Sequence, residues 1–241
     1  MFLPCADPED AARLVEIIAA DSWMAASGID VRWVPGKPTG LIVSIRGDLE
    51  GLEERRERLH ALAGRPAAPP LDPARARRLD APDHGGLPAD VARRLRAEGD
   101  RISAELLNPP ADTGTLVRVS FPPGRLAGAL TAIQAVGAAI SVPPGIGGST
   151  GAGVLEVKVP AESPAAAVAR FVADLREELS RLGDAGTAPD AARAVVVYAP
   201  DEVRNLTDTH GPVPSLALMR AVKDQLDPDH RMAPGRLAEA I

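Results

Sequence analysis

The sequence contains few of the residues that mark disulfide-linked, metal-binding or membrane proteins. Its 241 residues include a single cysteine, Cys5, which cannot form an internal disulfide and is typical of proteins in a reducing compartment. The four histidines, His60, His84, His210 and His230, do not have the spacing of metal ligands, so we expect no metal site. No run approaches the roughly 18 apolar residues of a membrane helix, and the N-terminus has no signal-peptide pattern. These absences predict a cytoplasmic protein without a membrane span.

Basic charge and aromatic side chains are also scarce. The chain has 27 Lys and Arg against 33 Asp and Glu, a net charge of −6, so it lacks the positive field that attracts nucleic-acid phosphates. Two Trp, one Tyr and three Phe offer no stacking surface for single strands and leave the core to aliphatic residues. We therefore expect no nucleic-acid partner. The remaining composition, 45% hydrophobic and 25% charged, is that of a globular protein.

Residues 1–63 are predicted to form a first unit of mixed helix and strand. After a short apolar run, Asp7 is followed by proline, a pair that favours the N-cap and first turn of a helix. Residues 29–34 and 41–45 are rich in branched side chains and flank a turn with Pro and Gly, which predicts a β-hairpin. A charged amphipathic helix is expected over residues 49–62. Because the unit begins inside its own first strand, we expect the chain to be the downstream part of something larger.

Residues 64–110 are predicted to be a Pro-rich connection that ends in a helix at about residues 89–107.

Residues 111–200 then repeat the order of the first unit and add a helix and a strand. The clearest helix follows Ser163 and Pro164, because its apolar residues recur on one face. We expect four strands, at 116–121, 138–142, 154–159 and 194–198, with a further helix at about 124–136.

The predicted order of strand, helix, strand, strand, helix and strand is the split βαβ pattern of ferredoxin-like folds, and the first unit is a shorter copy of it. We therefore expect an α+β fold. Two ferredoxin-like units would share an antiparallel sheet with helices on one face. A C-terminal helix and tail would follow over residues 201–241.

A glycine-rich run, PPGIGGSTGAG, occupies residues 143–153. A phosphate-binding loop leaves a strand and opens a helix, so that backbone N–H groups and the helix dipole meet the anion. This run instead joins two predicted strands, and no Lys follows its glycines. The sequence therefore favours a flexible hairpin loop.

His210 is the best single candidate for a titrating group near a ligand. It lies in the turn-forming sequence Thr209-His210-Gly211-Pro212, and histidine changes charge near neutral pH. The alternative is an ordinary histidine of a surface loop. Both interpretations stay open at this point.

The C-terminal segment SLALMRAVKDQLDPDHRMAPGRL, residues 215–237, carries the sharpest pattern. An apolar face predicts a helix that ends at Asp227-Pro228, and Pro234-Gly235 forces a turn. This segment resembles the closing segment of FAD-linked oxidases of the vanillyl-alcohol oxidase and p-cresol methylhydroxylase type, where a Lys-bearing helix leads into D-P, a spacer and N-P-G-R or N-P-G-K. Over most of residues 1–241 the order of elements is also similar to the cap domain of bacterial glycolate oxidase FAD-binding subunits.

The resemblance implies an FAD cofactor and a small 2-hydroxy acid as substrate. It places Pro234, Gly235 and Arg236 against the flavin domain and His210 on the substrate side. Arg236 would contact a carboxylate or phosphate, or alternatively form a salt bridge within the tail. The chain departs from the family in two ways: Ala233 replaces the usual Asn, and the flavin domain with its glycine-rich pyrophosphate segment is absent.

The sequence thus predicts the cap component of a split, glycolate oxidase-like oxidoreductase that is inactive alone. Its expected partners are an FAD-binding-domain protein and other oxidase subunits, and the catalytic residues stay unassigned. Two alternatives remain. One is a non-catalytic ferredoxin-like binding or assembly module, because a fold does not decide a function. The other is the remnant of a broken gene, which would leave an exposed apolar patch.

Overall fold

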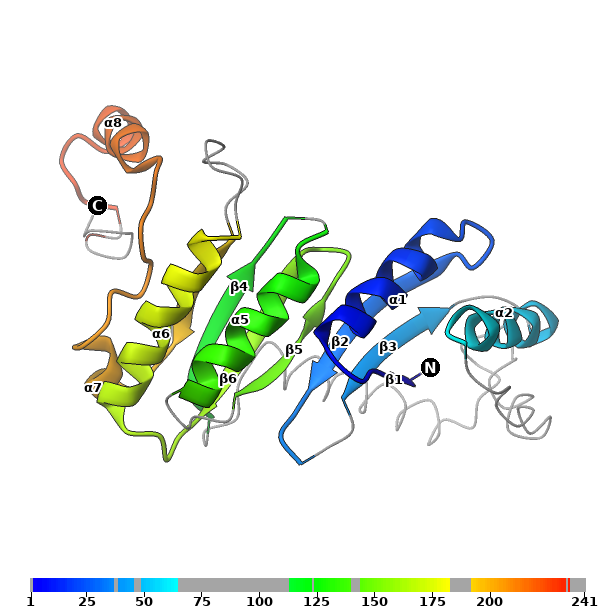
Figure 1. Ribbon diagram of the computed structural model, residues 1–241. Coiled ribbons are helices and arrows are strands. Elements are labelled where there is room, and N and C mark those ends of the chain that lie inside the picture. Colours follow the sequence, from blue (N-terminus) through cyan, green and yellow to red (C-terminus); the bar gives the residue numbers. More distant parts are fainter. Residues whose placement is uncertain are drawn as a thin grey trace, which may run out of the picture.

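The fold is taken from a computed structural model, which describes residues 2–36, 39–45, 49–64, 113–122, 124–139, 144–182, 192–232 and 234. In these residues seven strands form one sheet in the order β1-β3-β2-β5-β6-β4-β7, and every neighbouring pair is antiparallel. Helices α1, α5 and α6 lie side by side on one face of this sheet (Figure 1). The strands are β1 (Phe2–Pro4), β2 (Ala26–Trp33), β3 (Gly40–Ile45), β4 (Thr113–Ser120), β5 (Gly145–Ser149), β6 (Val154–Pro160) and β7 (Arg193–Tyr198).

The helices complete an α+β architecture of two ferredoxin-like units, as the sequence predicts. Strands β4, β5, β6 and β7 lie in the order of a split βαβ fold, and β1, β2 and β3 repeat its first three positions. The antiparallel pair β2–β5 joins the two units. None of the described helices is long and apolar enough to cross a bilayer. The helices are α1 (Pro8–Ala20), α2 (Leu49–Leu62), α5 (Leu126–Ala139), α6 (Ala165–Ser180), α7 (Asp201–Arg204) and α8 (Leu216–Leu226).

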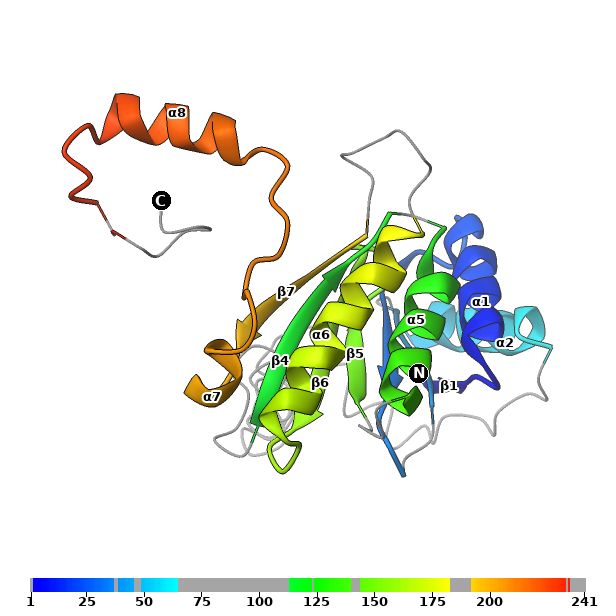
Figure 2. The ribbon, with the colours of Figure 1, turned by 60° about the vertical axis from the view of Figure 1, so that its left-hand side comes forward.

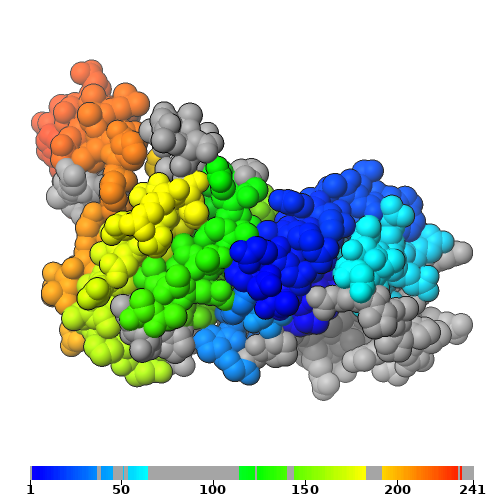
Figure 3. Space-filling view, viewed as in Figure 1, coloured from blue at the N-terminus to red at the C-terminus, as the bar shows by residue number. Residues whose placement is uncertain are grey.

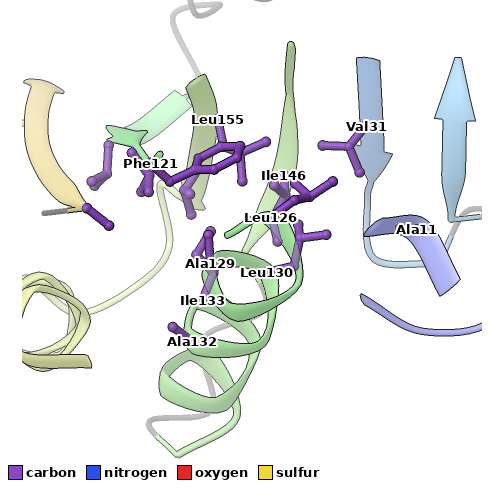
Figure 4. Close-up of a cluster of buried hydrophobic side chains, with 14 of the residues drawn as sticks. Ala11, Val31, Phe121, Leu126, Ala129, Leu130, Ala132, Ile133, Ile146 and Leu155 are labelled. Carbon is purple, nitrogen blue, oxygen red and sulfur yellow. The ribbon is translucent and has the colours of Figure 1, made fainter. Parts of the chain in front are cut away.

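The core fills the space between the sheet and the three covering helices. Strand alternation turns Val31, Leu155 and Val157 toward the helices, where each is buried. Figure 4 shows Leu126 and Leu130 of α5 directed toward Ile146 of β5. Aliphatic side chains supply nearly all of this core, as the low aromatic content predicts.

Local signals in the sequence explain where α1 and α6 lie. The carboxylate of Asp7 caps α1 by accepting a 2.7 Å hydrogen bond from the Asp10 amide, and proline follows it in the first turn. The periodic apolar face of α6, with Phe171 and Leu175 fully buried, packs on the sheet as predicted. Pro164 stands at the N-cap of α6 without a side-chain cap bond, so Ser163 does not cap this helix.

The prediction of a strand at residues 138–142 is wrong for residues 138 and 139, which belong to helix α5, and residues 140–142 lie outside the described part. The next described strand is β5, inside the glycine-rich run. The prediction of that run as a hairpin loop is correct only for its second half, a turn from Thr150 to Gly153. Gly148 has φ +147°, and a Cβ there would lie 2.4 Å from the Val154 carbonyl oxygen, so only glycine fits. Sequence patterns missed β5 because glycine carries no alternation signal.

Several predicted elements lie outside the described residues. These are the Pro-rich connection from residue 65 onward and the helix at about residues 89–107. Apart from the strand at residues 138–142, the other predicted strands and helices are present, with ends that shift by a few residues. Helix α2 lies beside α1 at the β1 end of the sheet (Figure 1).

Candidate functional site

The C-terminal segment closes on the carboxylate of Asp227, the first residue after α8. Oδ2 of Asp227 accepts a 2.6 Å hydrogen bond from Nζ of Lys223 and a 2.9 Å bond from the Met232 amide. Oδ1 accepts a 2.9 Å bond from the Arg231 amide. Nζ of Lys223 also donates to the Met232 carbonyl oxygen at 2.9 Å. We call these four residues the Asp227 clip.

The clip fixes the charge state of its carboxylate. The hydrogen bond from Lys223, supported by the amide of Met232, lowers the pKa of Asp227 to about 2. Both side chains are almost buried, with 11% of the Lys223 side chain and 8% of the Asp227 side chain exposed. The Asp-Pro sequence, predicted only as a helix end, therefore also holds the following loop.

Helix α8 has apolar side chains that stay exposed. None of its residues is buried, and Leu218, Val222 and Leu226 are exposed. The helix stands apart from the sheet and its covering helices when the molecule is turned (Figure 2). In the space-filling view it projects from the end of the molecule next to α6, away from α1 (Figure 3). The arm, residues 215–232, is thus ordered by its own clip rather than by the body of the protein.

The structure places the predicted tail residues only in part. Pro234 is exposed and lies two residues beyond the clip. Ala233, Gly235 and Arg236 lie outside the described residues. The role of Arg236, as an anion contact or as a salt bridge within the tail, stays a prediction.

His210 lies on the outer side of a tightly bonded turn after α7. Its amide donates to Oδ1 of Asp208 at 3.0 Å, and its Nδ1 lies 3.1 Å from Oγ1 of Thr209. The Thr209 carbonyl oxygen accepts a 2.7 Å bond from the Val196 amide, which fastens the turn to the outer edge of β7. The imidazole is exposed, so the turn presents it to solvent in a fixed position.

Arg176 of α6 supports this turn from beneath. Its guanidinium donates to the carbonyl oxygens of Ala194, at 3.0 Å, and Thr209, at 3.3 Å. Burial lowers the pKa of Arg176, and the nearby charge of Asp208 opposes that shift. Gly211 has φ +70°, and a Cβ there would lie 2.8 Å from Nε of Arg176. Sequence reasoning missed Arg176 because an arginine on an amphipathic helix carries no signal of a distant partner.

A row of polar side chains crosses the sheet face opposite α1, α5 and α6. Backbone pairing aligns Arg32 of β2 with Gly147 of β5, then Glu156 of β6 and Arg118 of β4. Arg118 donates to Oε1 of Glu156 at 2.9 Å. The alternation of residues 154–159 predicts that Glu156 faces away from the helices, but nothing in the sequence pairs it with Arg118.

The glycine-rich run does not form a cradle for the FAD pyrophosphate. It forms a strand and then a turn into another strand, not a loop that opens a helix. Within the described residues, no group of three His, Cys, Asp or Glu is arranged to hold a metal ion. The sequence matches no family model and no curated protein.

Proposed function

We propose that the chain is the cap and tail component of a split FAD-dependent oxidoreductase that oxidises a small 2-hydroxy acid, with FAD held on a separate chain. The observation that carries the proposal is the arm, whose helix α8 has an exposed apolar face and is followed by the clip. In the sequence, Pro234-Gly235-Arg236 comes next. The antiparallel sheet and the helices that cover it would form the cap.

The apolar face of α8 favours a docking role. An amphipathic helix gains most of its stability from packing its apolar side, and here that side faces solvent. Burying a leucine such as Leu218 or Leu226 in a partner stabilises a complex by about 1.5–3 kcal/mol. A partner chain with an apolar groove would supply the missing contact.

The Asp227 clip supports the same role. It holds the loop after α8 with two backbone amides and one lysine before any partner binds. A preorganised segment loses less conformational entropy on association, which raises affinity. The clip therefore fixes the path of residues 227–232, which lead toward Pro234.

The division of chemistry follows from what this chain contains. FAD on the partner chain would accept two electrons and a proton, together a hydride, from the hydroxyl-bearing carbon of the substrate. This chain would provide the sheet as the wall of the substrate site, with Arg236 available for an anionic group. His210, fixed by Arg176 and Thr209, would be the substrate-side residue of the cap.

Co-expression with a flavin-domain chain encoded next to this one tests the proposal. We expect a yellow complex that co-purifies. Leu226→Asp should weaken that association at least ~10-fold, because it places a charge on the docking face. Leu206→Asp is the matched control, since Leu206 is 59% exposed, against 77% for Leu226, but lies outside the arm.

The outcomes separate the competing functions. A chain that stays colourless and never associates with a flavoprotein would rule out the split enzyme. Association through α8 with a protein that carries no flavin would instead favour a ferredoxin-like binding or assembly module. Equal loss of binding in both variants would show that the arm is not the docking element.

A further inference from the structure

Three polar side chains, those of Asp30, Arg32 and Glu156, lie near Gly147 on the sheet face opposite the helices. Arg32 and Glu156 pair with Gly147 from its two sides, so both point to the same face as that residue. Asp30 lies on the same face, two residues before Arg32 in β2, and pairs with Ser149 of β5. Because Gly147 has no side chain, nothing from β5 stands between Arg32 and Glu156, whose strands lie about two spacings, ~10 Å, apart.

Glu156 has one satisfied oxygen and one that is not. Its Oε1 accepts from Arg118, while Oε2 is buried without a hydrogen-bond partner. Only 9% of the Glu156 side chain is exposed. A buried carboxylate oxygen without a donor costs free energy, so a donor from a bound molecule would be favoured there.

The groups opposite Glu156 are also unpaired. Among the described residues, neither Arg32 nor Asp30 takes part in a hydrogen bond or ion pair of its side chain. Partial burial of Asp30 raises the pKa of its carboxyl group. Arg32 is exposed, and its planar guanidinium has the geometry to bind a carboxylate with two parallel hydrogen bonds.

We propose that Arg32 and Glu156 bind a small carboxylic acid that carries a hydrogen-bond donor on its second carbon. The carboxylate of the ligand pairs with the guanidinium of Arg32, and its hydroxyl or ammonium group donates to Oε2 of Glu156. The proposal rests on the proposed function only for the choice of a 2-hydroxy acid as ligand.

Calorimetry on the full isolated chain tests the site with three probes: glycolate, acetate and glycine. Acetate has the carboxylate without a donor, and glycine replaces the hydroxyl by an ammonium group. We expect glycolate to bind at least ~10-fold more tightly than acetate, because acetate leaves Oε2 unpaired. Tighter binding of glycine than of glycolate would support the site and overturn its assignment to a hydroxy acid.

Two variants separate the roles of the two residues. Glu156→Gln should reduce glycolate affinity to the level of acetate and leave acetate affinity unchanged. Arg32→Gln should weaken both ligands at least ~10-fold, and as an exposed, unpaired residue its loss should leave folding intact. Arg170→Gln is the control, because Arg170 lies exposed on α6, on the opposite face of the sheet. Circular dichroism verifies the fold of each variant.

The proposal fails if the wild-type chain binds none of the probes, if glycolate and acetate bind equally, or if Arg32→Gln binds like the wild type. These results are independent of the test of the split enzyme, which measures association through α8. A complex that forms while glycolate does not bind the isolated chain would overturn the site alone. A chain that binds glycolate and never associates with a flavoprotein would overturn the split enzyme alone.

Discussion

At the scale of single residues, Asp227 gives the arm its pH dependence. Its pKa is about 2 in the folded chain, against an ordinary value of 3.8. A lowered pKa means that the carboxylate stabilises the clip fully above the ordinary value and loses that effect as the pH falls toward 2. We expect the protection of the Arg231 and Met232 amides against hydrogen exchange, relative to the intrinsic rate at each pH, to fall over this acidic window, as measured by NMR.

The same measurement distinguishes Asp227 from its neighbours. Asp227→Asn removes the charge that binds Lys223 and should speed amide exchange at Met232 at least ~10-fold at neutral pH. Asp229→Asn is the control, because Asp229 is exposed in the same loop and its side chain bonds to no described residue. Equal exchange rates in the two variants would show that the clip does not hold the loop.

For single residues, the sequence predicted where helices end and turns lie better than it predicted which side chains bond to each other. The helix end at Asp227 and the turn around His210 were predicted from Pro and Gly. The bonds from Asp227 to Met232 and from Arg176 to Thr209 were not, because each depends on how the chain folds back in space. Propensities report local backbone preference, and these contacts are set by the backbone path between elements.

At the scale of elements, β5 is the strand most dependent on glycine. Gly148 sits where a Cβ would meet the Val154 backbone, whereas a Cβ at Gly145 would meet only Lys158, at ordinary contact distance. Gly148→Ala should lower the free energy of unfolding by about 2–4 kcal/mol, since it adds backbone strain and a clash. Gly145→Ala should stay within about 1 kcal/mol.

Urea unfolding followed by circular dichroism measures both changes. A Gly148→Ala variant as stable as the wild type would contradict the position of β5 in the sheet.

The amphipathic helices α1 and α6 were predictable because periodic apolar residues report which side is buried. Strand β5 was not predictable, because its glycines give no alternating pattern of apolar and polar side chains. It is defined by its hydrogen-bonded pairing with β2 and β6.

At the scale of the whole molecule, the body and the arm are separate in their packing. A chain truncated after residue 214 keeps the Thr209 carbonyl that Val196 and Arg176 bind, and loses only residues of α8 and the tail. Because α8 contributes no buried side chain, we expect the melting temperature to change by less than about 3 °C. Calorimetry checks this, and a larger drop would place the arm in the core of the body.

The overall architecture followed from the order of elements alone. Two sets of strands and helices in ferredoxin-like order predicted a shared sheet, and the pair β2–β5 is where the sharing takes place. The independence of the arm could not be predicted, since the apolar face of α8 looks in sequence like any helix that packs on its own domain.

The pairing of β2 with β5 has a consequence for the symmetry of the chain. These strands hold the same position in their two units, they run antiparallel, and helices α1 and α5 also hold equivalent positions above them. Equivalent surfaces that meet in this way have the arrangement of a two-fold symmetric dimer. The two units therefore meet within one polypeptide as the subunits of a two-fold symmetric dimer would meet across their interface. Among the described residues, only the second unit has a fourth strand and is followed by the arm, an asymmetry that two separate identical subunits could not have.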